Sequence, residues 1–120
     1  MTATIESKVL LEHTLTALAE LKGRDPISMD VAELSDFTDW MVLVSGTSNR
    51  HVRSLVDNLL ESVKALGIQP MGVEGREESH WVLVDLGDVV VHVMQDEART
   101  FYDLERLWSD LPKPDRESTP

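Results

Sequence analysis

The sequence of 120 residues contains no cysteine, which excludes disulfides, catalytic thiols and thiolate metal sites. It also lacks any apolar run that approaches the ~20 residues a membrane-spanning helix needs. Its first residues, Met1–Lys8, hold no basic segment followed by an apolar stretch. Neither a secretion signal nor a transit peptide is therefore expected, and a soluble cytoplasmic protein is predicted.

Basic residues are scarce, with 11 Lys and Arg against 22 Asp and Glu, for a net charge of −11. Between Asp25 and Asn49 there are five acidic residues and no Lys or Arg. A surface of this charge repels nucleic acid and anionic membranes, and it favours a basic partner. The simpler interpretation, that the acidity only keeps the protein soluble, stays open.

Length and composition predict one folded domain. A chain of 120 residues with 42% apolar residues can bury a real core. Three of the five prolines lie in the last twelve residues, Ser109–Pro120, which show no periodic pattern. We expect a single domain over residues 1–108 and a mobile C-terminal tail over residues 109–120.

Hydrophobic periodicity predicts three helices. The first covers residues 4–22, and the second is an amphipathic helix with Thr47 or Ser48 as N-cap and Gly67 at its end. The third begins near Asp96. The apolar positions that define them are Leu11, Leu15, Leu18 and Leu21; then Val52, Leu55, Val56, Leu59, Leu60, Val63 and Leu66; then Phe101, Leu104 and Leu107 or Trp108.

Five strands are predicted from alternating or wholly apolar segments. They are Ile27–Val31, Trp40–Val44, Pro70–Glu74, Trp81–Asp85 and Asp88–Met94. The order α-β-β-α-β-β-β-α predicts an α/β or α+β fold, in which a mixed five-stranded sheet has the helices on one face.

The last two strands form a predicted hairpin with two unlike faces. With Leu86-Gly87 as a two-residue turn, one face holds three opposed pairs, which are Asp85 with Asp88, Leu83 with Val90, and Trp81 with His92. The other face consists of valines only, and we expect it to pack on the helices; its members are Val82, Val84, Val89, Val91 and Val93.

The mixed face of the hairpin is an unusual surface. Two opposed aspartates repel each other, and an aromatic side chain beside them resembles a binding hot spot for a cationic partner. In the simpler alternative, Trp81 packs under a loop and the aspartates only flank a turn. If Trp81, Leu83 and Val90 are exposed, their apolar area also favours a homodimer in the free protein.

One junction suggests an enzyme. Ser45–Asn49 joins a strand to a helix, where phosphate can bind, but the spacing of a P-loop is absent. Nucleotidyltransferases place two carboxylates one residue apart after such a turn, whereas here Asp57 is followed by Leu59 two positions on. A helix N-cap is the simpler account, and a divergent nucleotidyltransferase-like enzyme using Gly46-Thr47-Ser48 is the alternative function.

No cofactor or metal site is expected, because none of the four histidines has the spacing of a metal-ligand motif. Arg50, His51 and Arg53 form a local basic cluster that could contact RNA, although three such residues are typical of a solvated helix face.

Four segments in order resemble the ribosomal silencing factor family, also called Iojap-related. They are Gly46–Val52, Gly72–Gly75, Trp81–Val93 and Phe101–Trp108. The resemblance covers residues 10–108. It implies a nucleotidyltransferase-like fold without the catalytic carboxylates, and a ribosome-associated factor that is not an enzyme.

The resemblance also implies a partner and a mechanism. Members bind the fourteenth large-subunit ribosomal protein (uL14) where the subunits meet. They sterically block subunit joining, which represses translation under nutrient limitation, and a role in large-subunit maturation is ascribed to them. The partner face implied by the resemblance comprises Trp81, Asp85, Asp88 and His92, with Glu74 and Tyr102 as weaker candidates.

Overall fold

The computed structural model describes residues 6–34, 36, 38–97 and 99. Its elements are α1 (Ser7–Glu20), β1 (Arg24–Asp30), β2 (Trp40–Gly46), α2 (Asn49–Ala65), β3 (Gly72–Glu74), β4 (Trp81–Asp85) and β5 (Val89–Gln95). The first seven predicted elements are thereby confirmed. Residues 96, 97 and 99 are helical where the third helix was expected to begin. The remainder of that helix and the predicted tail lie outside the described residues.

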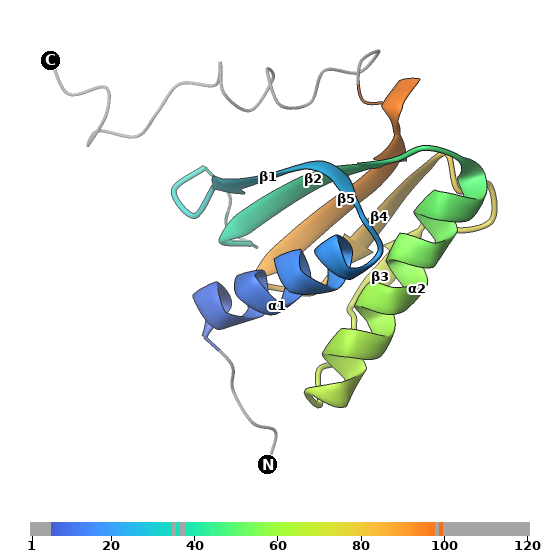
Figure 1. Cartoon of the computed structure of the whole chain (residues 1–120). Coiled ribbons are helices and arrows are strands. Elements are labelled where there is room, and N and C mark those ends of the chain that lie inside the picture. The colour runs from blue at the N-terminus through green and yellow to red at the C-terminus, as the bar shows by residue number, and fades with distance from the viewer. Residues whose placement is uncertain (1–5, 35, 37, 98, 100–120) are drawn as a thin grey trace, which may run out of the picture.

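The strands form one mixed sheet in the order β1-β2-β5-β4-β3. Only β2 and β5 run parallel among these neighbours, and the other three pairs are antiparallel. Both α1 and α2 lie on the same face of the sheet (Figure 1). The predicted α+β architecture is confirmed, because the described residues form a mixed sheet with α1 and α2 on one face (Figure 1).

The core lies between this sheet and the two helices. Every valine of the predicted apolar hairpin face is fully buried there. The apolar stripe of α2 meets these valines, as its spacing of three and four residues predicted. The helix contributes Val52, Leu55, Val56, Leu59, Leu60 and Val63, and α1 adds Leu10, Leu11, Ala17 and Leu18.

The start of β1 differs from prediction. The strand begins at Arg24, three residues early, and its register shifts between Arg24 and Ile27. Pro26 has no N–H for the ladder, and Asp25 before it adopts a positive φ of 48°. Such an irregularity is tolerated because β1 is an edge strand of the sheet.

The predicted hairpin register is wrong by two residues. Asp85 pairs with Val90, Leu83 with His92 and Trp81 with Met94. The turn is Gly87-Asp88, closed by a 2.9 Å hydrogen bond from the Leu86 N–H to the Val89 carbonyl. Gly87 has a φ of +92° and takes the first central position, which type II′ turns reserve for glycine. Because side chains alternate with a period of two, this shift leaves both predicted faces unchanged.

Two consequences of the predicted register fall with it. Asp85 and Asp88 are not opposed, because Asp88 lies in the turn and Asp85 faces Val90. Val90 is only 5% exposed, so the apolar area available for self-association comes from Trp81 and Leu83 without it. The expected homodimer stays a prediction on this reduced basis.

Within the residues that the structure describes, no helix has both the length and the apolarity that crossing a membrane requires.

One buried polar atom in the helical layer gives a stability prediction. The Thr14 hydroxyl of α1 is fully buried and has no hydrogen-bond partner within the described part of the chain. Replacing Thr14 by valine removes this unpaired group at nearly constant volume, and it should raise the free energy of unfolding by about 1 kcal/mol. Urea denaturation measures the change. Thr16→Val, on the exposed side of the same helix, is the control and should change stability by less than about 0.5 kcal/mol. A Thr14→Val protein less stable than its parent would contradict the prediction.

Candidate functional site

The sheet face opposite the helices carries the mixed side chains of the hairpin. One cross-strand row runs over all five strands and contains Ile27, Leu43, His92, Leu83 and Glu74. Ile27 is partly exposed, and from Leu43 toward β3 the exposure rises. Leu43 is fully buried, His92 and Leu83 are half-buried, and Glu74 is exposed. This face therefore becomes accessible on the side of β3 and β4.

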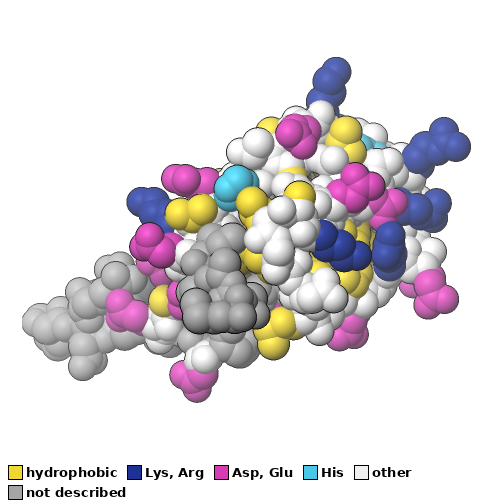
Figure 2. All heavy atoms as spheres, turned by 90° about the horizontal axis from the view of Figure 1, so that it is seen from below, with side chains coloured by type: hydrophobic (Ala, Val, Ile, Leu, Met, Phe, Trp, Pro, Cys, Tyr) yellow, Lys and Arg dark blue, Asp and Glu magenta, His cyan; other side chains and the backbone are white. Residues whose placement is uncertain are grey.

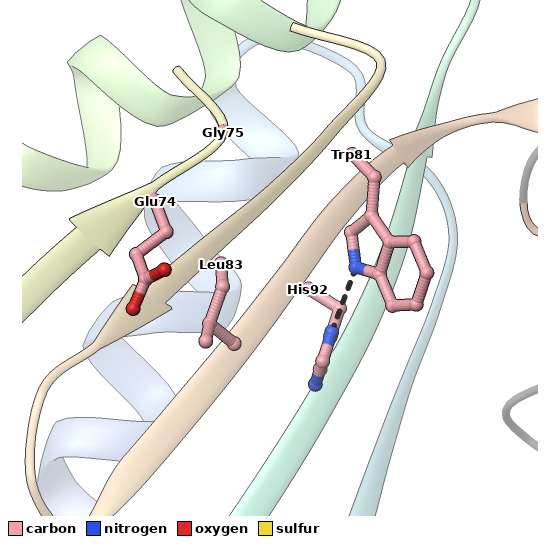
Figure 3. Close-up of a pocket in the computed structure, with 5 residues that line it drawn as sticks. All are labelled: Glu74, Gly75, Trp81, Leu83 and His92. Atoms are coloured by element: carbon pink, nitrogen blue, oxygen red, sulfur yellow. Dashed lines mark hydrogen bonds between the residues drawn. The ribbon is translucent and has the colours of Figure 1, made fainter.

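A shallow depression of about 300 Å³ opens on this side. Its lining consists of Glu74, Gly75, Trp81, Leu83 and His92 (Figure 3). Three neighbouring strands supply these residues, because β3, β4 and β5 lie side by side in the sheet. The structure thus brings together three of the six predicted site residues, Glu74, Trp81 and His92. It adds Leu83, which the sequence placed on this face, and Gly75.

A hydrogen bond joins Trp81 and His92 in the depression. The indole Nε1–H donates a 2.9 Å hydrogen bond to His92 Nδ1, and the ring centroids lie 5.8 Å apart. The two residues are diagonal neighbours across β4 and β5, because His92 pairs directly with Leu83. Burial lowers the pKa of His92 from 6.5 to about 4. The ring is therefore neutral at pH 7, and with Nδ1 accepting, it carries its proton on Nε2.

The indole of Trp81 is only half-buried. It packs against a small cluster of Leu43 and Met94, which Met29 also contacts. Its place on the face opposite the valine core confirms the predicted orientation. Trp81 is neither a core tryptophan nor a freely projecting one, since packing and the bond to His92 both fix the ring.

The loop from β3 to β4 approaches the backbone of Trp81 closely. Gly75 has a φ of +83°, and a Cβ at this position would lie 2.3 Å from the Trp81 carbonyl oxygen. The Ser79 N–H donates to the Gly75 carbonyl, and the Ser79 hydroxyl donates to the Arg76 carbonyl. Arg76 also forms an ion pair with Asp57 of α2. The loop is therefore a compact turn that only glycine allows to approach Trp81 so closely.

Asp85 and Asp88 lie apart from the depression. Asp85 is two pairs along the hairpin from Leu83, and its carboxylate accepts a 2.9 Å hydrogen bond from the Gly87 N–H. Asp88 is exposed in the turn, and its carbonyl accepts from the N–H groups of Asp39 and Trp40. Tyr102 lies outside the described residues. Asp85 thus stabilises the turn through this hydrogen bond, which the sequence did not predict.

The turn before α2 is occupied by its own hydrogen bonds. Ser48 is the N-cap, and its hydroxyl accepts from the His51 N–H. His51 Nδ1 accepts a 2.9 Å bond from the Thr47 N–H, and its Nε2–H donates to the Leu21 carbonyl at 2.8 Å. His51 was predicted to be part of a basic cluster with Arg50 and Arg53. Instead it ties this turn to the end of α1, which no spacing in the sequence indicated.

Gly46 also has a structural reason in this turn, since a Cβ there would lie 2.8 Å from Val52 Cγ2.

Across the described residues, no three His, Asp or Glu side chains gather where they could hold a metal ion. In the view of Figure 2, acidic side chains are spread widely over the surface, whereas most visible Lys and Arg side chains gather toward one side.

Fold and surface together define a small α+β domain with a polar-rimmed apolar depression on its sheet. The family described as "Ribosomal silencing factor during starvation" matches residues 4–120. The chain belongs to this ribosomal silencing factor family.

Relatives and a solved structure agree with this assignment. The ribosomal silencing factor RsfS of Haemophilus influenzae is 42% identical over 83% of this chain and 98% of its own. The mouse protein named "Mitochondrial assembly of ribosomal large subunit protein 1" is 32% identical over 88% of this chain and 47% of its own. A crystal structure of a Chromobacterium violaceum protein superposes with a TM-score of 0.86, at 37% identity over 92% of both chains.

Gly75→Ala should show how strongly the loop constrains Trp81. Gly67 has the same φ of +83° but nothing within 4 Å of its Cβ position, so Gly67→Ala is a control for backbone strain alone. We expect Gly67→Ala to lower the free energy of unfolding by about 1 kcal/mol, and Gly75→Ala by at least about 1 kcal/mol more. Denaturant titration compares the two. Equal losses would show that the carbonyl of Trp81 moves freely.

The buried imidazole predicts a pH dependence. The folded state disfavours protonated His92, so its contribution to stability is complete above the unfolded pKa of 6.5 and is lost as the pH falls toward about 4. Between pH 7 and pH 4 the parent should lose up to about 3 kcal/mol more stability than His92→Gln. The difference between the two proteins cancels the titration of shared carboxylates, including Glu74 of the same depression. Parallel pH profiles would contradict the prediction.

Proposed function

We propose that this protein is a ribosomal silencing factor that binds the large ribosomal subunit through its ribosomal protein fourteen (uL14). The bound domain occupies the subunit interface and sterically blocks joining of the small subunit, which represses translation under nutrient limitation. It acts in the cytoplasm, where ribosomes are, and it catalyses no reaction. A role in maturation of the large subunit is part of the proposal.

The half-buried tryptophan of the depression is the observation that carries this function. Tryptophan is the residue most enriched among binding hot spots, which lie in desolvated pockets with polar groups around them. Trp81 has this setting, with the apolar Leu83 beside it and Glu74 and His92 at its margins. A ring held by packing and by a hydrogen bond also loses little freedom on binding, which favours affinity.

Charge supports a basic protein as the partner. In the described part of the chain Glu74 and Asp88 form no ion pair, whereas Asp57 and Asp96 are paired with arginines. Glu74 in the depression, and Asp88 in the turn at the end of the hairpin, can form charge-assisted hydrogen bonds with Lys or Arg of a partner. The net charge of −11 adds attraction during the approach.

The names of relatives support the ribosomal part of the proposal. The Haemophilus influenzae relative is named a ribosomal silencing factor, and the mouse relative is named for assembly of the mitochondrial ribosomal large subunit. The first name supports a ribosome-associated silencing role, and the second supports the large subunit as the partner. The proposal has two further parts. Residues 1–108 act as one domain, and the contact also includes Asp85, Asp88 and Tyr102.

Trp81→Ala tests the proposed contact. We expect a folding loss of about 1–2 kcal/mol, below the ~3–5 kcal/mol typical of a buried aromatic, because the ring is half-buried. Binding to purified large subunits should weaken by about thirtyfold or more, as expected for a central aromatic anchor. Sucrose-gradient sedimentation measures binding, and light scattering during subunit association measures inhibition of joining.

Leu15→Ala is the matched control, because it truncates a half-buried apolar side chain that packs on the helical side of the sheet. It should lower stability and leave binding unchanged. If the parent protein neither sediments with large subunits nor slows their association with small subunits, the proposed function is wrong. If it does both and Trp81→Ala is equally active, the function stands and the contact lies elsewhere.

A further inference from the structure

The second nitrogen of the His92 ring is the least explained polar group of the depression. Nδ1 accepts the indole hydrogen bond, and Nε2 points away from Trp81 (Figure 3). Within the described residues, Nε2 has no partner. A half-buried N–H without a partner has lost part of its hydration. A hydrogen bond to an acceptor therefore lowers the free energy of the complex.

The donor character of Nε2 follows from Trp81. An indole nitrogen can only donate, so the imidazole atom that it contacts must accept. In a neutral ring the proton then lies on the other nitrogen. The lowered pKa of His92 has the same consequence, since a protonated ring would offer two donors and could not accept from Trp81. Trp81 is therefore a positioning residue that fixes the tautomer of His92.

We propose that His92 donates its Nε2–H to a neutral carbonyl oxygen of the partner, and that Trp81 sets this polarity. The inference rests on the proposed function and adds the chemistry by which the partner is recognised. It assigns His92 a directional hydrogen bond and leaves the attraction of cations to the carboxylates.

A neutral carbonyl is the acceptor that fits this site. Glu74 lines the same depression, and the net charge of the chain is −11, so a carboxylate acceptor would be repelled. A lysine or arginine side chain has no acceptor atom to offer to Nε2–H. A main-chain carbonyl, or that of Asn or Gln, meets both conditions, and basic side chains of the same partner can still reach Glu74.

Two amide variants separate this role from a merely structural one. In His92→Asn, the shorter amide reaches only the position of Nδ1, where its oxygen can still accept from Trp81. In His92→Gln, the longer amide places an N–H donor near the position of Nε2. We expect His92→Asn to bind purified large subunits about tenfold more weakly than the parent, and His92→Gln to stay within about threefold of it. Near-ultraviolet circular dichroism measures whether both variants keep the packing around Trp81, as we expect.

Nitrogen-15 NMR of the free protein provides a readout independent of ribosomes. We expect His92 to show a protonated Nε2 and an unprotonated Nδ1 at pH 7, and Trp81→Phe, which keeps an aromatic ring but removes the donor, to give a mixture of tautomers. A protonated Nδ1 in the parent, or equal binding by parent and His92→Asn, overturns the inference while the proposed function stands. A parent that does not bind large subunits overturns both.

Discussion

Side-chain alternation in the β4–β5 hairpin is the constraint on which the rest of the structure depends. A strand sends successive side chains to opposite faces of the sheet, so the valines that fill the core leave the residues between them to the other face. Val82, Val84, Val91 and Val93 pack under the helices and are fully buried. Trp81, Leu83 and His92 must then lie together on the far side. The core and the partly exposed face with the depression are two consequences of one pattern.

The same constraint explains how much the sequence could predict. The faces depend only on the parity of each position. Val82, Val84, Val91 and Val93 mark one face, and Trp81 and His92 between or beside them mark the other. The register depends on which two residues form the turn, and Gly87 is acceptable at either central position of a two-residue loop. The sequence therefore predicted which residues share a surface, but it placed Trp81 opposite His92 when it is diagonal to it.

Interactions between distant segments were the least predictable part. His51 joins the turn before α2 to the Leu21 carbonyl, 30 positions earlier, and Gly75 contacts the backbone of Trp81 through a turn of unusual conformation. The local sequence around His51 and around Gly75 does not predict either contact. The chemistry of His92 is of the same kind, because its tautomer depends on a neighbour that only the folded sheet brings within 2.9 Å.

The parallel pairing at the centre of the sheet has a consequence for synthesis of the chain. Trp40 pairs with Val89 and Gly46 with Gln95, so each partner in this ladder is 49 residues away along the chain. Loop closure over such a distance is slow compared with formation of α2 or of the hairpin. While the chain is being made, the apolar segment 40–44 can pack against α1 and α2, but β1 is its one neighbouring strand among the described residues until β5 has emerged. The edge of β2 that pairs with β5 is therefore open to misassociation during synthesis. It is covered once β5 has been made.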